Sequence, residues 1–278
     1  MNKVIMIVLD GLQDRVALSS LGYVNHLVEV GKAAYYSVRS ELPSLSRPLY
    51  EVLLTGTPSS QNGITANHIV RLSKQTSIFH LAAEKGLTTA AAAYFWVSEL
   101  YNRAPFNPLT DREQHERNLP IQHGKFYFED TYPDSHLFAD AEVLRRSWDP
   151  DFLYIHSMNI DDTGHKFGSD SKEYRGKTLM MDGILALMLP IWMEENYHIV
   201  ITSDHGMNTD GMHGGTGDDE RNVPMFVISP NVQPAIYEDR IPQLALASMV
   251  CKLLGLKPAA EMIDYTIPGF QHGIHAGE

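Results

Sequence analysis

The sequence predicts an α/β fold in which helices cover both faces of a mostly parallel central sheet. Apolar runs bounded by turn residues recur along the chain, as expected for strands that are buried on both faces. Helical patterns lie between these runs, so that strand and helix alternate. The length of 278 residues suits one domain with insertions better than two domains. We therefore expect residues 1–278 to form a single domain.

Five apolar runs are the best candidates for the strands of this sheet. They are residues 4–11, 88–97, 151–160, 197–206 and 223–230. The helical patterns between and after them cover residues 47–56, 76–86, 136–147, 171–196 and 241–255. A glycine stands where a helix C-cap belongs in three of these patterns, at Gly56, Gly86 and Gly255. The first run is far too short to span a bilayer, which makes it the predicted first strand.

Segment 99–134 interrupts this alternation. It is rich in Asn, Pro, Arg, His and aromatic residues, and it shows neither a clear helical pattern nor a clear strand pattern. A loop of this length inside a compact domain is usually functional or else poorly ordered. We predict that the segment is a lid or a wall on the substrate side of the domain.

The composition limits the classes of partner. A formal charge of −12 argues against a nucleic-acid polymer or a membrane surface, because either would favour a basic face. The charge does not exclude an anionic small molecule, since bound divalent cations can invert the local potential. Cys251 is the single cysteine, so no disulfide framework forms within the chain. With no signal-peptide pattern at the N-terminus, we expect a soluble, cytoplasmic protein. The oligomeric state is not indicated.

Residues of metal-binding type follow three of the predicted strands. They are Asp10 after the first run, Asp161 and His165 after the third, and Asp204, His205 and His213 after the fourth. A single Asp at a strand end is usually a turn or cap residue. Three such ends, two of which add His, indicate a common site beyond the C-terminal ends of parallel strands. Mixed Asp and His ligands suit zinc or a similar first-row ion better than calcium or magnesium.

Ser46 stands just before Arg47-Pro48 and an apolar helical pattern that ends at Gly56. Ser at an N-cap with Pro close behind it is an ordinary capping arrangement. The same position also points a hydroxyl at the positive end of a helix dipole, where a metal ion can hold it as an alkoxide and an anion can bind. The residues alone leave both interpretations open.

The order of these motifs resembles the alkaline phosphatase superfamily, and most closely its nucleotide pyrophosphatase/phosphodiesterase branch. That branch has an Asp-Gly after the first strand and a Ser or Thr nucleophile that begins a helix ending in Thr-Gly. A Pro, a Gly-Ile pair, an Asp-x-x-Gly-His block, a Ser-Asp-His-Gly-Met block and a late His follow. The matching residues here are Asp10-Gly11, Ser46 with Thr55-Gly56, Pro58, Gly63-Ile64, Asp161 to His165, Ser203 to Met207, and His213.

The resemblance implies two divalent metal ions, zinc first and manganese as an alternative. One set of ligands is Asp161, His165 and His213, and the other is Asp10, Asp204, His205 and the oxygen of Ser46. Asn67, twenty-one residues after Ser46, matches the Asn that binds a phosphoryl oxygen in the phosphodiesterase branch. The implied activity is hydrolysis of small phosphate esters through a phosphoseryl intermediate at Ser46, as a phosphodiesterase or nucleotide pyrophosphatase.

Three features depart from the phosphodiesterase pattern. Arg47 replaces the Phe that usually follows the nucleophile. It is either an exposed helix residue or a bidentate clamp for a doubly charged phosphate, which would favour a monoester. Asn62 replaces the His of a His-Gly-Ile motif, and we expect it to be structural. His213 follows Asp204 without the usual long insertion, which indicates a minimal core.

A phosphomonoesterase and a phosphonate hydrolase are therefore the main alternatives. A sulfatase is disfavoured, because its motif places Pro before the Arg whereas "SLSRP" places it after. A phosphomutase would normally carry a large inserted domain, and 278 residues leave no room for one. A non-catalytic metal-binding module is disfavoured as well, because an inactive site has no reason to keep Ser46.

Overall fold

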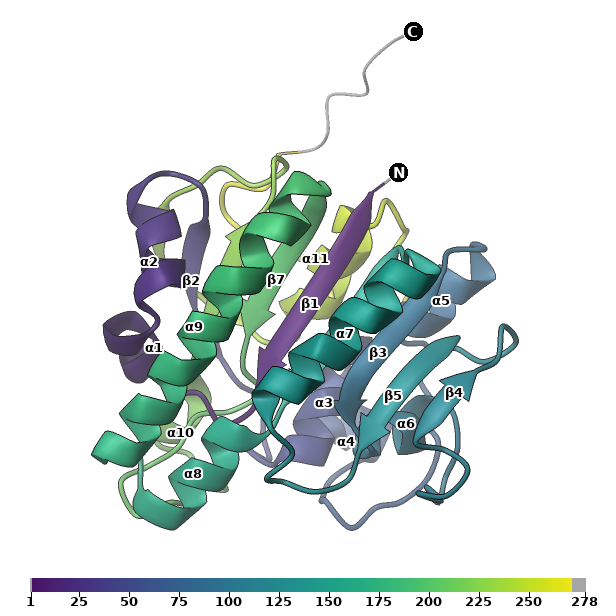
Figure 1. Cartoon of the computed structure of the whole chain (residues 1–278), viewed down its shortest axis with the longest axis horizontal. Coiled ribbons are helices and arrows are strands. Elements are labelled where there is room, and N and C mark those ends of the chain that lie inside the picture. The colour runs from purple at the N-terminus through teal and green to yellow at the C-terminus, as the bar shows by residue number, and fades with distance from the viewer. Residues whose placement is uncertain (1, 272–278) are drawn as a thin grey trace, which may run out of the picture.

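Nine strands form one sheet in the order β4-β5-β3-β6-β1-β7-β8-β2-β9 (Figure 1). The computed structural model describes residues 2–271. Its strands are β1 (Lys3–Leu9), β2 (Ala34–Arg39), β3 (Thr89–Tyr94), β4 (Glu113–His115), β5 (His123–Tyr127), β6 (Phe152–Ser157), β7 (Tyr197–Thr202), β8 (Asn222–Ile228) and β9 (Ile236–Pro242). The strands from β5 to β7 in this order run parallel, whereas β8 and β4 run antiparallel to their neighbours β7 and β5. The predicted α/β fold with a mostly parallel sheet is confirmed.

Helices cover both faces of the sheet, as Figure 1 shows. They are α1 (Asp14–Ser20), α2 (Gly22–Glu29), α3 (Ser46–Thr55), α4 (Ser59–Asn62), α5 (Ile78–Glu84), α6 (Trp96–Tyr101), α7 (Asp134–Trp148), α8 (Asn159–Phe167), α9 (Lys172–Glu194), α10 (Asp218–Arg221) and α11 (Ala245–Leu253). Apolar residues of α3, α5, α6 and α11 pack on one face of the sheet, and those of α1, α2, α7 and α9 pack on the other.

Strand β1 lies at the centre of both apolar cores. Its side chains alternate between the faces, so Val4 and Met6 join one core while Ile5 and Ile7 join the other. All four are fully buried. This two-sided burial explains why the strand is a continuous apolar run rather than an alternating one.

Segment 99–134 differs from the predicted loop. It contains the end of α6 and both β4 and β5, which pair with each other and extend the sheet beyond β3. Strand β4 has only three residues and strand β5 five, so neither is long enough to display a clear period of two. A lid role for the segment stays a prediction.

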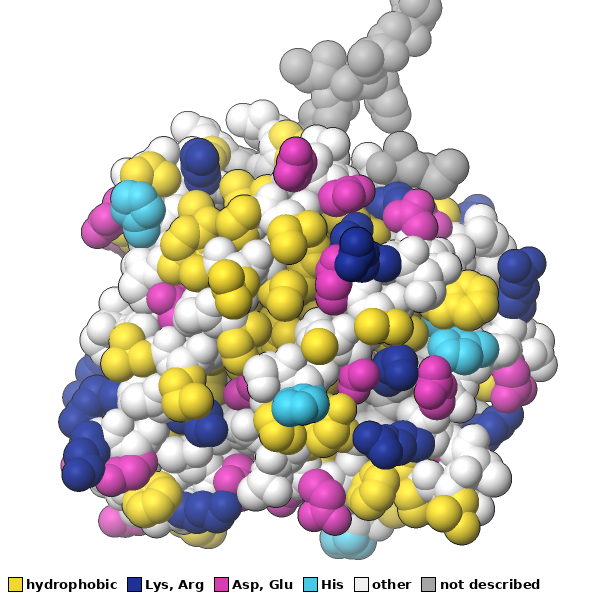
Figure 2. Space-filling model, viewed as in Figure 1, with side chains coloured by type: hydrophobic (Ala, Val, Ile, Leu, Met, Phe, Trp, Pro, Cys, Tyr) yellow, Lys and Arg dark blue, Asp and Glu magenta, His cyan; other side chains and the backbone are white. Residues whose placement is uncertain are grey.

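Helix α9 is, among residues 2–271, the one helix long and apolar enough to cross a membrane by length and composition alone. It packs against α2, α8 and β7, so part of its apolar surface belongs to the core. Its outer side exposes Leu179, Met180, Leu187 and Ile191. Figure 2 shows apolar side chains gathered over this helix on the face that it covers.

Candidate two-metal active site

The C-terminal ends of β1, β6 and β7 meet at one edge of the sheet, because these strands are parallel neighbours. Asp10 directly follows β1, Asp161 lies in the first turn of α8 after β6, and Asp204 follows β7. Gly11 makes the close approach possible: its φ is +72°, and a Cβ there would lie 2.8 Å from the Cα of Asp161. The fold therefore assembles carboxylates that are far apart in sequence.

One cluster contains Asp10, Asp204 and His205, with one ligand atom of each within 4.8 Å of the others. His205 Nε2 lies 3.3 Å from Asp10 Oδ1 and 3.4 Å from Asp204 Oδ2. The hydroxyl oxygen of Ser46, the first residue of α3, lies 3.1 Å from the same nitrogen. The structure thus brings together the four residues predicted to share one ion.

A second cluster contains Asp161, His205 and His213. His213 Nε2 lies 4.0 Å from Asp161 Oδ1, and His165 Nε2 lies 3.4 Å from Asp161 Oδ2. His165 was predicted as a ligand here; it contacts Asp161 but is outside the cluster of three. His205 belongs to both clusters, because its ring stacks on that of His213 with 3.7 Å between centroids and 8° between planes.

Backbone carbonyls fix the tautomer of all three histidines. The Nδ1–H groups of His165, His205 and His213 donate to the carbonyl oxygens of Gly211, Gly206 and Ser44, at 2.7, 2.9 and 2.8 Å. A carbonyl only accepts, so each Nδ1 carries a proton, and Nε2 presents a lone pair whenever the ring is neutral. This arrangement orients histidine ligands in metal sites.

Three buried carboxylate oxygens at the site have no hydrogen-bond partner: Asp10 Oδ1, Asp161 Oδ1 and Asp204 Oδ2. Leaving buried anionic oxygens unpaired costs several kcal/mol each. Divalent cations would pair these oxygens, and the set of carboxylate oxygens and imidazole nitrogens is of the kind that holds zinc or a similar ion. The residues therefore fit a metal centre.

The electrostatics of the clusters agree with this fit. Burial and the neighbouring carboxylates of Asp204 and Asp161 raise the pKa of Asp10. Burial and the charge of Asp161 raise the pKa of Asp204 to about 7, and burial lowers the pKa of His213 to about 4. His213 is thus neutral and ready to act as a ligand, while the ion-free carboxylates attract protons that a cation would displace.

Asn67 and Arg47, the other two residues predicted to act in catalysis, lie close to the start of α3. The side-chain oxygen of Asn67 accepts a hydrogen bond from the backbone N–H of Arg47 at 3.1 Å. Arg47 is 1% exposed, so it is not the exposed helix residue that one alternative predicted. Its Nη2 donates to Oε2 of Glu99 at 2.7 Å, and its guanidinium carbon lies 4.6 Å from the centre of the Trp96 ring. Its charge is therefore already paired.

Sequence reasoning missed two residues that contact Asp10. The hydroxyl of Tyr50 donates to Asp10 Oδ2, and His156 Nε2 lies 3.2 Å from the same oxygen. Tyr50 follows Ser46 by four residues, which places both on one side of α3. That spacing was a usable signal. His156 lies inside β6, and a histidine within an apolar run is usually a core residue with its hydrogen bonds satisfied, so the sequence did not single it out.

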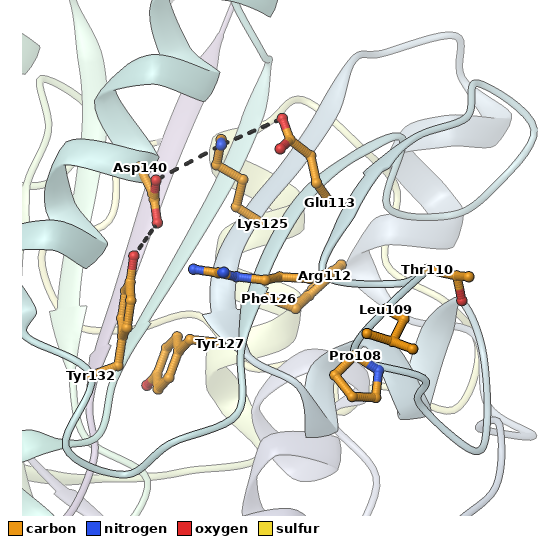
Figure 3. Close-up of a pocket in the computed structure, with 10 residues that line it drawn as sticks. All are labelled: Pro108, Leu109, Thr110, Arg112, Glu113, Lys125, Phe126, Tyr127, Tyr132 and Asp140. Atoms are coloured by element: carbon orange, nitrogen blue, oxygen red, sulfur yellow. Dashed lines mark hydrogen bonds and ion pairs between the residues drawn. The ribbon is translucent and has the colours of Figure 1, made fainter.

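A separate pocket of about 420 Å³ lies between segment 99–134 and α7 (Figure 3). Its lining residues are Pro108, Leu109, Thr110, Arg112, Glu113, Lys125, Phe126, Tyr127, Tyr132 and Asp140. Tyr127 also donates its hydroxyl to the backbone oxygen of His156 at 2.9 Å, so one wall of the pocket contacts the strand that leads into the metal clusters.

Solved structures of this superfamily share the fold. Human ectonucleotide pyrophosphatase/phosphodiesterase 5 superposes with a TM-score of 0.72 at 15% identity, over 92% of this chain and 96% of that one. A phosphonoacetate hydrolase from Sinorhizobium meliloti gives 0.53 at 19% identity, over 73% of this chain and 56% of that one. These identities establish the fold alone.

Curated relatives are named GPI ethanolamine phosphate transferases. Transferase 2 from Debaryomyces hansenii is 26% identical over 82% of this chain and 26% of its own length. The human catalytic subunit of transferase 3 is 33% identical over 38% of this chain and 10% of its own length. This chain therefore spans only a minor part of each of these two relatives.

The predicted cytoplasmic location is wrong. The curated relatives are named GPI ethanolamine phosphate transferases, and this similarity points against a cytoplasmic location. The prediction rested on the lone cysteine and on the N-terminal pattern, which carry no information about a lipid substrate. The same names leave the predicted absence of a membrane partner unsupported.

The family of type I phosphodiesterases and nucleotide pyrophosphatases has a model that matches residues 4–213, more than half of the chain. The matched segment contains Ser46 and both clusters. The superfamily predicted from the motifs is confirmed by this match and by the shared fold. The chain belongs to the type I phosphodiesterase/nucleotide pyrophosphatase family, a family of phosphoester-acting enzymes within the alkaline phosphatase superfamily.

Proposed function

We propose that this chain is a two-metal hydrolase of small phosphate esters, diesters first, that works through a phosphoseryl intermediate at Ser46. One observation carries the proposal. Unpartnered carboxylate oxygens of Asp10, Asp161 and Asp204 converge with the Nε2 atoms of His205 and His213, and the hydroxyl of Ser46 lies at the same place. A core of ordinary capping and packing residues would not leave three buried anions unpaired.

The ligands divide into two sets. Asp10, Asp204, His205 and Ser46 would hold one ion, and Asp161, His213 and His165 the other, with His205 next to both. We propose zinc, and manganese as the alternative. When bound, the ions would lower the pKa of the Ser46 hydroxyl and stabilise the charge on the leaving oxygen.

In the first half-reaction, Ser46 Oγ forms a bond to phosphorus while the bond from phosphorus to the leaving oxygen breaks. The hydroxyl proton passes to solvent, and the leaving oxygen takes a proton from water. Ser46 begins the ten-residue helix α3, whose N-terminal dipole favours the negative phosphoryl group. The Asn67 oxygen is held by the Arg47 N–H at 3.1 Å, which leaves its amide N–H groups to donate to a phosphoryl oxygen.

In the second half-reaction, a water oxygen attacks phosphorus, the bond to Ser46 Oγ breaks, and the serine regains a proton. A hydroxyl of an acceptor molecule in place of this water would make the enzyme a transferase. The names of the curated relatives favour this second candidate. Phosphomonoester and phosphonate hydrolysis use the same first half-reaction and remain alternatives within the proposal.

We assign Arg47 a positioning role rather than a substrate clamp. Its guanidinium is buried against Glu99 and Trp96, so binding a phosphate would require breaking an ion pair with 2.7 Å between its atoms. Its backbone N–H holds Asn67 at the same time. Arg47 therefore ties the start of α3 to the residue proposed to bind the phosphoryl group.

The experiment is a side-by-side assay of aryl phosphodiester, phosphomonoester, phosphonate and sulfate substrates, each with zinc and with manganese. Metal analysis of the same protein should find close to two equivalents of ion. Phosphorus NMR in the presence of ethanolamine or glycerol separates transfer to the added hydroxyl from transfer to water. Turnover of the diester with water as acceptor supports the proposal. Full activity without bound ions, or transfer to the added hydroxyl alone, contradicts it.

A further inference from the structure

Two histidines face each other across the outermost strand pair of the sheet. Strands β4 and β5 run antiparallel at the edge seen in Figure 1, and His115 lies directly opposite His123. Side chains at such positions project from the same face. Their Nδ1 atoms are 3.3 Å apart and their ring centroids 5.5 Å apart, so each ring points the same nitrogen at the other.

This spacing matches a shared metal ion. Two nitrogens that each lie about 2.05 Å from one tetrahedral ion are about 3.3 Å from each other. A direct N–H hydrogen bond between the rings would normally be shorter, at about 2.9–3.0 Å. The contact therefore suits either a long hydrogen bond between the rings or a shared ion, and the surroundings of the rings bear on the choice.

The surroundings of each ring suit a ligand. Oε1 of Glu113 lies 3.1 Å from Nε2 of His115, and a carboxylate at this position holds the proton on Nε2 and leaves the Nδ1 lone pair free. The His123 ring stacks on Trp148 with 3.9 Å between centroids and 9° between planes, which fixes its orientation. Burial lowers the pKa of His123 to about 4, so this ring is neutral at physiological pH.

We propose that His115 and His123 form a two-histidine site for a divalent first-row transition ion such as zinc, nickel or copper, with water completing the coordination. The site is separate from the two active-site clusters, which lie beyond β1, β6 and β7. An ion here would join β4 to β5 and fix Glu113. Because Glu113 also lines the pocket of Figure 3 and lies 3.4 Å from Lys125 Nζ, the ion would set the shape of that rim.

Trp148 provides the readout. Full-length protein is loaded with zinc, dialysed to remove weakly held ions, and titrated with Ni²⁺ while tryptophan fluorescence is recorded. Nickel bound at His123 should quench Trp148, whose ring lies 3.9 Å from the imidazole. Trp148→Phe should remove this quenching but keep the nickel affinity measured by calorimetry, which distinguishes Trp148 from Trp96 near the active site.

The variants His115→Gln and His123→Gln should each bind nickel at least tenfold more weakly than the wild type. His26→Gln is the matched control, because His26 is an exposed histidine on α2 whose Nδ1 lies 3.6 Å from a carboxylate oxygen of Glu29. His115 is partly exposed, so its variant should fold even if the His123 variant does not. Quenching that is absent in the wild type, or equal in wild type and His115→Gln, would overturn the proposal. Hydrolysis assays play no part, so its failure is distinct from failure of the proposed function.

Discussion

Arg47, the residue after Ser46, forms a buried ion pair with Glu99, with 2.7 Å between Nη2 and Oε2. The pair joins α3 to α6, and the second carboxylate oxygen of Glu99 accepts the backbone N–H of Phe106 at 2.9 Å. A single carboxylate thus connects the start of α3 to the segment predicted as a lid. Both side chains are almost fully buried, so neither charge has water as an alternative partner.

Glu99→Gln should therefore destabilise the protein strongly. It leaves the Arg47 charge buried and unpaired, which costs about 3–5 kcal/mol in comparable pairs. Urea denaturation measures the free energy of unfolding. Asp149→Asn is the matched control, because it also converts an acid to its amide but breaks a pair in which Asp149 is 71% exposed. We expect the control to lose less than about 1 kcal/mol. Equal losses in the two variants would show that the buried pair contributes nothing special.

Arg47→Lys tests the role of this residue in substrate binding. If the Arg47 side chain positions α3 through Glu99, the variant should lower kcat for monoester and diester by similar factors, because Ser46 would attack both substrates. The backbone N–H that holds Asn67 is unchanged by the substitution. A clamp for a doubly charged phosphate would instead raise the monoester KM selectively. The ratio of kcat/KM for an aryl monoester to that for an aryl diester decides between the positioning role and the clamp role. A selective loss on the monoester would contradict the positioning role.

Ser46→Ala should reduce turnover by more than about a thousandfold, because it removes the atom that attacks phosphorus. Metal binding should persist, since three other ligands of that ion remain. Ser59→Ala is the control: Ser59 is also a buried serine at the first position of a helix, and its hydroxyl has no hydrogen-bond partner among the described residues. Turnover assays and elemental analysis of the bound metal are carried out on each variant. Retained turnover in Ser46→Ala would mean that another group is the nucleophile.

Removal of the ions should make stability depend on pH in a defined direction. Burial and Asp161 raise the pKa of Asp204 to about 7 from its ordinary 3.8, and a hydrogen bond to Asp161 raises that of His165 to about 9 from 6.5. A raised folded-state pKa stabilises the protein below the ordinary pKa, and this stability is lost between the ordinary and the folded value. Asp204 therefore acts below about pH 7, and His165 acts between about pH 6.5 and about pH 9. Histidines with lowered pKa add nothing above the ordinary histidine pKa of about 6.5. The Tm of ion-free protein should thus fall between about pH 7 and about pH 9.

Zinc-loaded protein should not show this fall, because the ions require deprotonated ligands and bind more tightly as pH rises. Scanning calorimetry of chelator-treated and zinc-loaded samples compares the two. His165→Gln should reduce the slope of the ion-free protein over this range, since the group that titrates there is gone. An ion-free Tm that rises over the same range would contradict the assigned pKa directions.

The parts of the site that follow strands could be predicted from the sequence. Asp10 and Asp204 come directly after apolar runs, and the edge where parallel strands end collects such residues. The position of His205 between the two clusters could not be predicted, because it depends on the stacking of its ring on His213. The role of Glu99 could not be predicted from the sequence either. It lies 52 residues from Arg47, and no local sequence pattern indicates that the two residues form an ion pair.

The fold also has parts that could be predicted from the sequence and parts that could not. Strand β1 was predicted because every residue from Val4 to Leu9 is apolar, whereas the mostly buried strand β2 (AYYSVR) was not predicted. The edge strand β9 was not, because Glu238, Asp239 and Arg240 face solvent and remove the apolar signal. The sequence predicted strand β8 but did not indicate that it runs antiparallel to β7. An apolar run that is buried on both faces has the same pattern whichever way the strand runs.

Tyr50→Phe should weaken metal binding by about 10–100-fold, as loss of a hydrogen bond to a ligand commonly does. The Tyr50 hydroxyl donates to Asp10 Oδ2, which leaves Asp10 Oδ1 facing His205 Nε2 at 3.3 Å. Tyr154→Phe is the matched control, because the Tyr154 hydroxyl is also buried in this core but has no hydrogen-bond partner among the described residues. Competition with a chelator gives both affinities. If the two variants bind zinc equally well, Tyr50 contributes packing alone. If only Tyr50→Phe weakens binding, orientation of the Asp10 carboxylate is the cause.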